Sequence, residues 1–529
     1  MAPPENRGIV NAPESGKQPG LKSAVHRDVW EDNMSNPNKP DLGHPLGIPR
    51  RTLLKGAASA GLSGVIGTPF INRLKAMEAH PLAGKKIDMN ILGIAGWLPS
   101  SLGVKMSPLF ADYVKQRYGY DVSFGFAEAP FSDLFQKAAT SLATKSQEYN
   151  IIISDSQWLG ALAKPGWILK LNDIITKNKG LQLEWYSQTV IDTYMRYPDG
   201  SQDIWGLPQE GDTKALYVRK DLVEDPKEQA AFQAKYNMKL PSTFEDYENL
   251  NATDYEKVME FFTRPDKGLW GAAWQYSRVY DFCTCPLFSV MWSSGGQIWD
   301  PKTGQIEGVL NSDINTKAME LYKSWLKYMP PGATNYGIAE EIDVWTQGKV
   351  ATCLQWAAVG LAMITPENKD KVMVVPPPKF GKAGAEKRIY CMGGQPWVIN
   401  AFNDEAKMRV AVDFMNWWYL PETALEYSKR GGNPCDKATM GSAAFNGINP
   451  WNRAYKYMLE PGTSQDFWHD PKYSEMLSLQ QEGFTSYMTG QSKDAKGVLD
   501  YIACGQQQIL YDAGTAKKEP SGVCGNVSL

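Results

Sequence analysis

The chain has 529 residues, with 55 Lys and Arg against 58 Asp and Glu and a formal net charge of −3. This balance, without any block of Lys or Arg, argues against a nucleic-acid-binding surface. Only His26, His44, His80 and His469 are present, and the first two precede the expected folded region. A Ser-His-Asp triad, a Cys-His pair or a His-rich metal site would therefore depend almost wholly on His469, and we expect no metal.

Residues 49–64 read PRRTLLKGAASAGLSG and resemble a twin-arginine export signal. The motif positions are held by Arg50, Arg51, Leu54 and Lys55. The apolar stretch 56–71 is interrupted by glycines and is shorter than the roughly 20 residues of a membrane span. We therefore interpret residues 50–83 as a signal region and not an anchor; an ordinary basic turn before a buried helix is the alternative.

Residues 1–49 are rich in Pro, Asn, Gly and charge, which predicts a disordered leader. Because Met34 would give a more ordinary basic leader, a mis-assigned start at Met1 is the alternative. Removing about 80 residues leaves a chain of about 450, which is too long for one compact core and suggests two lobes.

Five segments after the signal region alternate between strand and helix patterns. Residues 87–91 and 121–126 alternate as strands, 150–154 reads as a short buried strand, and 104–118 and 131–145 read as helices. This β-α-β-α-β run predicts an open parallel α/β sheet. Ligands bind such sheets outside the carboxyl ends of the strands. The residues at these ends are Trp97, Glu128, Asp155, Ser156, Gln157 and Trp158.

The second half of the chain gives a more mixed pattern. We expect helices at 316–328, 404–420 and 492–510, a strand at 349–356, and a strand-turn-strand unit at 390–400. Prolines end any regular element within 371–378, and the turn-rich stretch 434–475 reads as an irregular insertion.

Seven cysteines in an exported chain permit disulfides. The pair that we favour is Cys504 with Cys524, which would close a loop of about 20 residues and contribute roughly 3 kcal/mol. The alternative, seven buried thiols acting as small hydrophobic residues, is equally consistent with the sequence.

Four stretches together resemble the extracellular solute-binding proteins of ABC importers, in the sugar-binding branch that includes maltose-binding protein. They are IIISDSQWLGALAKPGWILKLNDII at 151–175, WGLPQEGDTKALYVRKDLV at 205–223, FSVMWSSGGQIWD at 288–300 and DVWTQGKVATCLQWAAVG at 343–360. The resemblance implies two α/β lobes joined by crossing strands that close over a ligand in the cleft. It places residues 85–212 and 374–428 in lobe 1, and 213–373 and 429–529 in lobe 2.

The resemblance also implies a monomeric periplasmic receptor that hands a sugar or polyol to an inner-membrane ABC permease. A polyhydroxylated ring offers apolar faces for stacking and hydroxyls that need polar partners once water is expelled. Asp212 aligns with the family's ligand-binding acidic residue, and Trp274 to Tyr276 resemble its aromatic platform. The ligand-binding candidates are Trp97, Asp155, Gln157, Trp158, Glu210, Asp212, Trp274, Tyr276, Trp356, Trp397 and Arg430.

Each candidate also has a purely structural explanation. Large aromatic side chains most often belong to the core. Asp155 can simply cap the following helix, and Arg430 can cap a helix end or pair with a surface acid. The scarcity of arginine near the expected cleft, where only Arg430 and Arg278 are candidates, favours a neutral ligand over a sugar acid.

Two enzyme classes are the alternatives. A glycoside hydrolase would use a carboxylate pair, such as Asp212 with Glu210 or Asp155, but nothing in the sequence marks either pair. An exported redox enzyme would need a cofactor motif, and the chain has no CxxC, no P-loop and no GxGxxG after a strand. We therefore expect a receptor without a cofactor and without catalytic residues.

Overall fold

The computed structural model describes residues 80–177, 181–467 and 469–524. The chain divides into two compact units, residues 1–78 and 79–529, and all described residues belong to the second. The twin-arginine motif and nearly all of the expected leader and signal region lie outside the described residues.

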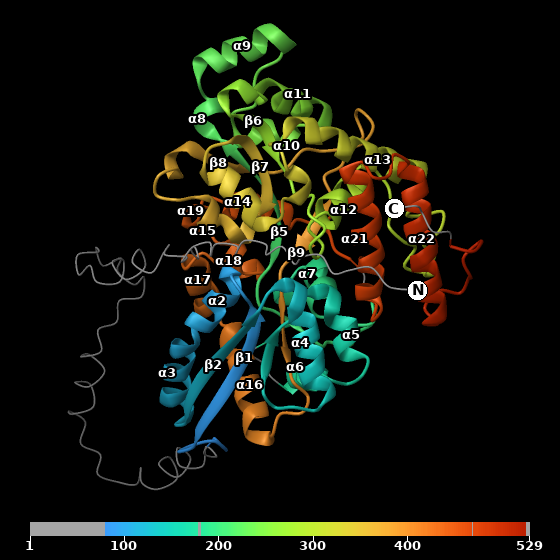
Figure 1. The fold of residues 1–529 in the computed structure, drawn as a ribbon. Coiled ribbons are helices and arrows are strands. Elements are labelled where there is room, and N and C mark those ends of the chain that lie inside the picture. Colours follow the sequence, from blue (N-terminus) through green and yellow to red (C-terminus); the bar gives the residue numbers. More distant parts are fainter. Residues whose placement is uncertain (1–79, 178–180, 468, 525–529) are drawn as a thin grey trace, which may run out of the picture. The chain divides into compact units, whose positions relative to one another are not determined.

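A five-stranded sheet with the strand order β2-β1-β3-β10-β4 forms the centre of the first lobe (Figure 1). Its strands are β1 Lys86–Ile94, β2 Asp121–Ala129, β3 Ile151–Ile153, β4 Leu207–Pro208 and β10 Pro396–Ile399. The three strands predicted near the start of the fold are confirmed, and β1 runs parallel to both β2 and β3. The sheet is nevertheless mixed and not purely parallel, because β10 pairs antiparallel with both β3 and β4.

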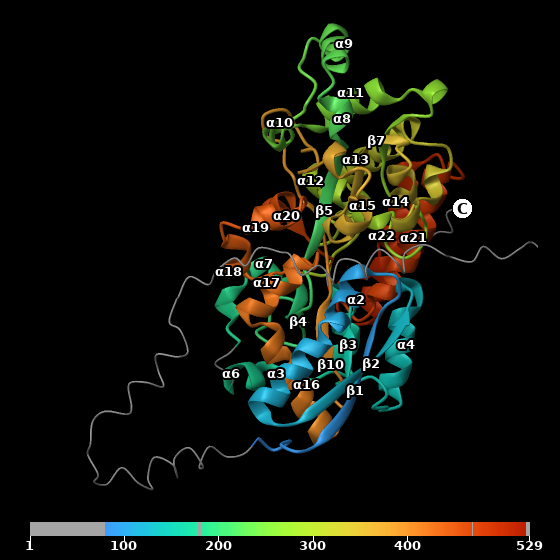
Figure 2. The same ribbon diagram turned by 90° about the vertical axis from the view of Figure 1, so that its left-hand side faces the viewer.

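Helices cover both faces of this sheet, with α3 and α16 on one face and α4 on the other (Figure 2). The helices of this lobe are α2 Leu98–Lys105, α3 Ser107–Tyr118, α4 Phe131–Ala143, α5 Leu159–Ala163, α6 Asn172–Lys177, α7 Gln188–Tyr194, α16 Glu405–Trp418 and α17 Pro421–Lys429. The helix expected at 104–118 is confirmed as α3 from residue 107, whereas residues 104–105 end α2, since Pro108 at the start of α3 lacks the N–H that would continue α2. Asp404 caps α16 by accepting from the Lys407 N–H, and Pro421 begins the next helix.

A six-stranded sheet forms the centre of the second lobe, with the order β11-β9-β5-β7-β6 and β8 paired to β5. Its strands are β5 Asp212–Arg219, β6 Trp270–Ala273, β7 Val350–Trp356, β8 Val372–Val375, β9 Tyr390–Gly393 and β11 Ser464–Gln465. Every residue of β7 is buried, as is almost all of β5. Burying one large aliphatic side chain contributes about 1.5–3 kcal/mol, so these strands hold the second lobe together.

The remaining helices surround the second sheet or pack on one another. They are α8 Lys220–Val223, α9 Pro226–Tyr236, α10 Phe244–Asn249, α11 Ala252–Phe262, α12 Thr284–Ser293, α13 Asp313–Ser324, α14 Ile338–Thr346, α15 Gly360–Met363, α18 Lys437–Gly441, α19 Phe445–Ile448, α20 Asn452–Met458, α21 Tyr473–Thr489 and α22 Ala495–Asp512. The expectation of an irregular stretch at 434–475 is wrong for much of its length, because its turn residues separate the short helices α18, α19 and α20. The buried rings of Phe445 and Tyr455 anchor α19 and α20.

Three segments carry the chain between the sheets: residues 209–211 join β4 to β5, residues 394–395 join β9 to β10, and the chain returns to the second sheet between β10 and β11. The first two lie side by side, because the N–H groups of Gln209 and Glu210 donate to the Gln395 carbonyl at 2.7 and 3.2 Å, and the third adjoins them where the Gly211 N–H donates to the Asn433 carbonyl at 3.0 Å. The first passage adjoins the expected lobe boundary at 212. The expected boundary at 374 instead falls within β8, and the chain enters the first sheet only after β9.

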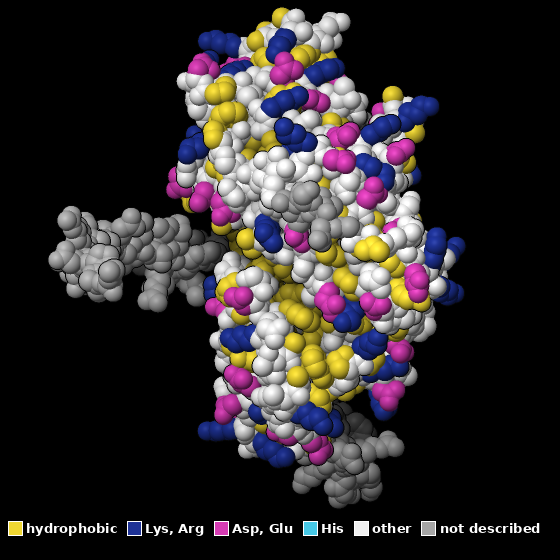
Figure 3. Space-filling model, turned by 45° about the vertical axis from the view of Figure 1, so that its right-hand side comes forward, with side chains coloured by type: hydrophobic (Ala, Val, Ile, Leu, Met, Phe, Trp, Pro, Cys, Tyr) yellow, Lys and Arg dark blue, Asp and Glu magenta, His cyan; other side chains and the backbone are white. Residues whose placement is uncertain are grey.

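The disulfide between Cys504 and Cys524 is confirmed and ties the C-terminal segment to α22. The other five cysteines are buried free thiols. Lys, Arg, Asp and Glu are interspersed over the face drawn in Figure 3 and do not gather into a single-sign patch there. Within the described ranges, every helix is too short or too polar to cross a bilayer.

Candidate ligand-binding cleft

The carboxyl edge of the first sheet brings together side chains that are far apart in the sequence. Trp97 follows β1, Asp155 follows β3, and Glu210 follows β4. Because β10 runs antiparallel between β3 and β4, its first residues, and Gln395 before them, lie at this same edge. Ligands bind open α/β sheets outside the carboxyl ends of the strands, so this edge is the expected binding site.

The second sheet supplies the opposite side of the same space. Its β5 begins at Asp212, which pairs with Gly393 at the end of β9, and its β7 ends at Trp356, opposite Lys214 of β5. Between the two edges lies a narrow cavity with a free volume of about 30 Å³, so a ligand can enter only when the lobes move apart. The cavity is lined by Trp97, Phe131, Asp155, Ser156, Gln157, Asp212, Tyr280, Asp281, Phe282, Cys285, Ile338, Trp356, Met392, Gly393, Gly394, Gln395, Asp466 and Phe467.

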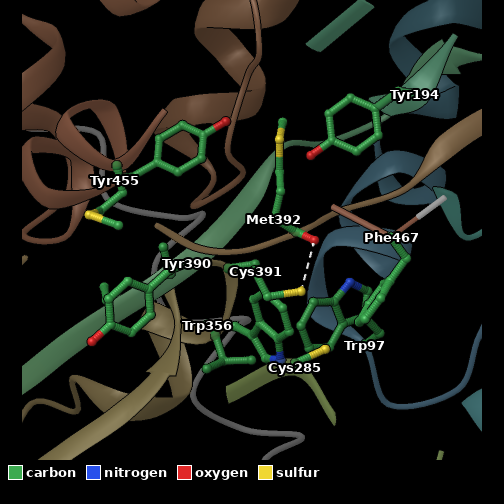
Figure 4. Close-up of a cluster of buried hydrophobic side chains, with 14 of the residues drawn as sticks. Trp97, Tyr194, Cys285, Trp356, Tyr390, Cys391, Met392, Tyr455 and Phe467 are labelled. Carbon is green, nitrogen blue, oxygen red and sulfur yellow. Dashed lines mark hydrogen bonds between the residues drawn. The ribbon is translucent and has the colours of Figure 1, made fainter. Parts of the chain in front are cut away.

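Aromatic rings from both lobes form the apolar part of the lining. Figure 4 shows the indoles of Trp97 and Trp356 and the ring of Phe467 gathered beside the Cys285 thiol. The ammonium of Lys214 lies 3.7 Å from the centroid of the Trp356 ring, a cation–π contact that fixes this indole from behind. The cavity therefore offers ring surfaces of the kind that stack on the C–H faces of a ligand.

Contacts between the two lobes hold the cavity closed in this structure. Gln157 of the first lobe donates through Nε2 to Asp281 Oδ2 of the second at 2.6 Å. Tyr280 donates its hydroxyl to Asp155 Oδ2 at 3.0 Å, and its ring stacks on Phe131 with centroids 5.5 Å apart. Polar side chains of the lining thus also serve as the latch between the lobes.

The two carboxylate oxygens of Asp155, at the end of β3, have different hydrogen-bond partners. Its Oδ1 caps the short 3₁₀ helix Ser156–Trp158 by accepting from the Gln157 N–H, as the structural alternative predicted. Its other oxygen faces Tyr280 in the cavity wall. Burial raises the pKa of Asp155 to about 8, with further contributions from the charges of Asp281 and Asp466.

Glu210 and Asp212 form a buried acidic pair at the crossing. Asp212 Oδ1 accepts from the N–H groups of Thr213 and Ala358 at 2.8 and 3.0 Å, while Oδ2 has no partner. Burial raises the pKa of Asp212 to about 7 and, together with the charge of Asp212, raises that of Glu210 well above its usual value. Asp212 reaches the cavity, whereas Glu210 Oε1 accepts from the Trp97 Nε1–H at 2.6 Å and so orients that indole.

Of the eleven candidates, the structure brings Trp97, Asp155, Gln157, Asp212 and Trp356 together on the cavity lining. Trp158 packs behind it, against Tyr280. The other aromatic candidates lie in the core: Trp274 against Trp325, Tyr276 stacked on Tyr322, and Trp397 against Phe414 and Trp418. Arg430 pairs with Glu426 one helical turn earlier and is not part of the lining.

Tyr280, Asp281, Asp466 and Phe467 are among the lining residues that sequence reasoning missed. Tyr280 and Asp281 lie in a turn between β6 and α12, where neither strand nor helix periodicity marks them. Asp466 and Phe467 follow the two-residue strand β11 inside the stretch that was expected to be irregular. The aromatic and acidic composition of both segments was the only signal available.

Among the described residues, no group of three or more His, Cys, Asp and Glu side chains converges as metal ligands do. The cavity lining also holds no Lys, Arg or His. What the described side chains offer is a set of hydrogen-bond acceptors beside aromatic faces, which suits a neutral or positively charged ligand with several donors.

Comparisons with known proteins place the chain in a family. The family model for bacterial extracellular solute-binding proteins matches residues 99–425, more than half of the chain. A mannitol-binding protein of Pseudomonas aeruginosa is 22% identical over 246 residues, which span 45% of this chain and 49% of the relative, so the match covers about half the length of each.

Solved structures show the same fold. An ABC transporter solute-binding protein of Agrobacterium radiobacter K84, in complex with ribitol, superposes with a TM-score of 0.64 at 20% identity, covering 81% of this chain and all of the other. A maltose-bound protein of T. maritima superposes with a TM-score of 0.64 at 18% identity, covering 80% of this chain and all of the other. The two-lobe fold predicted from the sequence is therefore confirmed, and this chain belongs to the bacterial extracellular solute-binding protein family.

Proposed function

We propose that this chain is the receptor of an ABC importer and that it binds a carbohydrate or polyol between its two lobes. The observation that carries the proposal is the cavity itself, where Trp97 and Trp356 flank the partnerless oxygens of Asp212 and Gln157. A polyhydroxylated ligand presents C–H faces to such rings and hydroxyl donors to such oxygens. Relatives with bound ribitol or maltose, and one described as mannitol-binding, support this ligand class.

In this proposal five side chains touch the ligand: Trp97, Asp155, Gln157, Asp212 and Trp356. Glu210 positions Trp97, and Trp158 supports Tyr280, so both act through a neighbour. Binding would proceed by bending at the passages between the sheets, near 209–211, 394–395 and 433, and this bending would bring Gln157 onto Asp281 and Tyr280 onto Asp155. The ligand thus completes a closure that the protein's own latch contacts favour.

The remaining parts of the proposal concern the cellular setting. The twin arginines at 50–51 would direct the folded chain to the periplasm, where a monomer would deliver its ligand to membrane permease subunits. We propose no catalytic step, because the acidic side chains of the cavity are accounted for by ligand binding and by the latch. A hydrolase has no observation in its favour.

A thermal-shift screen of the purified full chain tests the proposal, with ribitol, D-mannitol, D-glucose and maltose as probes. A ligand at a hundred times its dissociation constant adds about 2.7 kcal/mol to the free energy of unfolding, which raises the melting temperature measurably. Stabilisation by at least one probe, with the probe recovered unchanged by chromatography, is the expected result. Cleavage of maltose would refute the receptor assignment.

A further inference from the structure

The charged side chains that line the cavity are all acidic. Asp155, Asp212, Asp281 and Asp466 all line it, and among the described residues no Lys, Arg or His does. Asp155, Asp212 and Asp281 are each at most 7% exposed. A ligand that enters this space therefore meets carboxylates from both lobes and no basic side chain.

Four of the side-chain donors that line the cavity are committed to acidic or amide oxygens. Tyr280 OH and Ser156 Oγ donate to Asp155, and Gln157 Nε2 donates to Asp281. Trp97 Nε1–H donates to Glu210 and to Gln395 Oε1. These four donors are turned toward protein acceptors and away from a ligand.

The buried side-chain atoms of the lining that have no partner are all acceptors. Asp212 Oδ2, Gln157 Oε1 and Asp466 Oδ2 are buried and have no partner. Asp212 and Gln157 are 1% and 3% exposed and line the cavity, so their orphaned oxygens await a donor from the ligand. A hydroxyl group brings one donor together with acceptor lone pairs of its own, whereas an ammonium brings three donors and no acceptor.

A metal ion is a poor match for these acids. Three of them, Asp155, Asp281 and Asp466, lie close enough to influence one another electrostatically. Their oxygens nevertheless do not converge as a metal site requires, according to the geometry of the described residues. An organic cation is larger than a metal ion and suits carboxylates spaced around a cavity.

We propose that the ligand carries an ammonium group, as an amino sugar or an amino polyol does, and that this group is seated among Asp155, Asp281 and Asp466. The inference rests on the proposed function, because the hydroxylated remainder of the ligand occupies the aromatic part of the cavity. The raised pKa values of Asp155, about 8, and Asp466, about 7, accord with it, since a bound cation would offset both the cost of burying these charges and the repulsion between them. Lys214 is turned to Gln275 and to the Trp356 ring, so it does not neutralise the three carboxylates directly.

Isothermal titration of the full chain at pH 7.5 with matched probes tests the proposal. The pairs are D-glucitol with 1-amino-1-deoxy-D-glucitol, and D-glucose with D-glucosamine; D-gluconate and calcium chloride complete the set. In at least one pair, the amino member should bind ten times more tightly or better than its neutral partner, a difference of about 1.4 kcal/mol. Equal affinity within both pairs, tighter binding of gluconate, or binding of calcium alone overturns the ammonium site.

The substitution Asp466→Asn provides the site-specific test, because it removes one carboxylate while keeping its size. It should lower the ratio of amino to neutral affinity at least fivefold. The matched control is Asp173→Asn, at a side chain that is 90% exposed in α6, and it should leave the ratio unchanged. An unchanged ratio in Asp466→Asn overturns the placement of the ammonium.

The two proposals fail in distinguishable ways. If neutral sugars or polyols bind and their amino partners bind no better, the receptor assignment is supported and the ammonium site is refuted. If putrescine binds but no polyhydroxylated probe does, the ammonium site stands and the carbohydrate receptor falls. If a chain shown by circular dichroism to be folded binds none of these probes, both are refuted.

Discussion

Replacing Asp212 by Asn should make the protein more stable and at the same time a weaker binder. Asp212 lines the cavity and is 1% exposed; its Oδ1 accepts from two backbone N–H groups, and its Oδ2 is buried without a partner. Asn keeps the Oδ1 acceptor and removes the buried charge. Ala would instead leave two N–H groups unpaired, which costs about 1–3 kcal/mol each. A loss of affinity in the Ala variant could then result from destabilisation of the fold.

The size of the stability effect follows from the pKa of Asp212, which rises from 3.8 to about 7 on folding. A raised pKa means that the folded state resists ionisation. The penalty is therefore absent below about pH 4, grows as the pH rises, and is complete above about pH 7. A rise of three pKa units corresponds to roughly 4 kcal/mol. This is an upper estimate, because the ionisation of Asp212 is coupled to that of Glu210.

Urea unfolding of wild type and Asp212→Asn at pH 4.5 and pH 8 measures this difference. The variant should gain up to roughly 4 kcal/mol at pH 8 and much less at pH 4.5. Its affinity for the ligand should fall about 10- to 150-fold, because a hydrogen bond to a charged acceptor contributes about 1.5–3 kcal/mol. A loss of stability at pH 8, or unchanged affinity, would refute the reasoning; Asp173→Asn is the exposed control.

Three further substitutions test other parts of the structure. Trp97→Phe removes the N–H that Glu210 and Gln395 share, so the free energy of unfolding in urea should fall by about 2–4 kcal/mol; a variant as stable as wild type would contradict that role. Cys524→Ser opens the C-terminal loop and should cost about 3 kcal/mol under non-reducing conditions, an effect that should vanish when wild type is also reduced. Arg430→Ala should change ligand affinity by less than about twofold, since its partner is the surface residue Glu426 and such pairs are weak; a tenfold loss in titration calorimetry would place Arg430 in the site.

The sequence was sufficient to place one edge of the cavity. Trp97, Asp155 and Gln157 follow strands whose hydrophobic patterns are local and clear, and the rule for parallel sheets converts strand ends into a site. Asp212 came from the family resemblance and not from periodicity. The helix at 492–510 and the disulfide between Cys504 and Cys524 could also be predicted from the sequence, because a cap, an amphipathic run and the two cysteines are all local signals.

The rest could not be predicted because it depends on contacts between distant segments. Tyr276 stacks on Tyr322, and nothing near either residue shows that the ring is used in the core and not in the cleft. The antiparallel placement of β10 likewise depends on pairing with β3 and β4, which are remote in sequence. Asp281 enters the site only because the lobes meet there, where Gln157 reaches it from the other side.

The central claim is that the cavity between the lobes binds a polyhydroxylated ligand without transforming it. Titration calorimetry of the full chain against ribitol, D-mannitol, D-glucose, maltose and the amino partners of the glucose and glucitol series tests it directly, with mass spectrometry of the recovered ligand. The account predicts saturable binding of one ligand per chain, abolished or weakened at least tenfold in Asp212→Asn, and complete recovery of the intact ligand. Binding that Asp212→Asn leaves unchanged, or a ligand that is consumed, would contradict it.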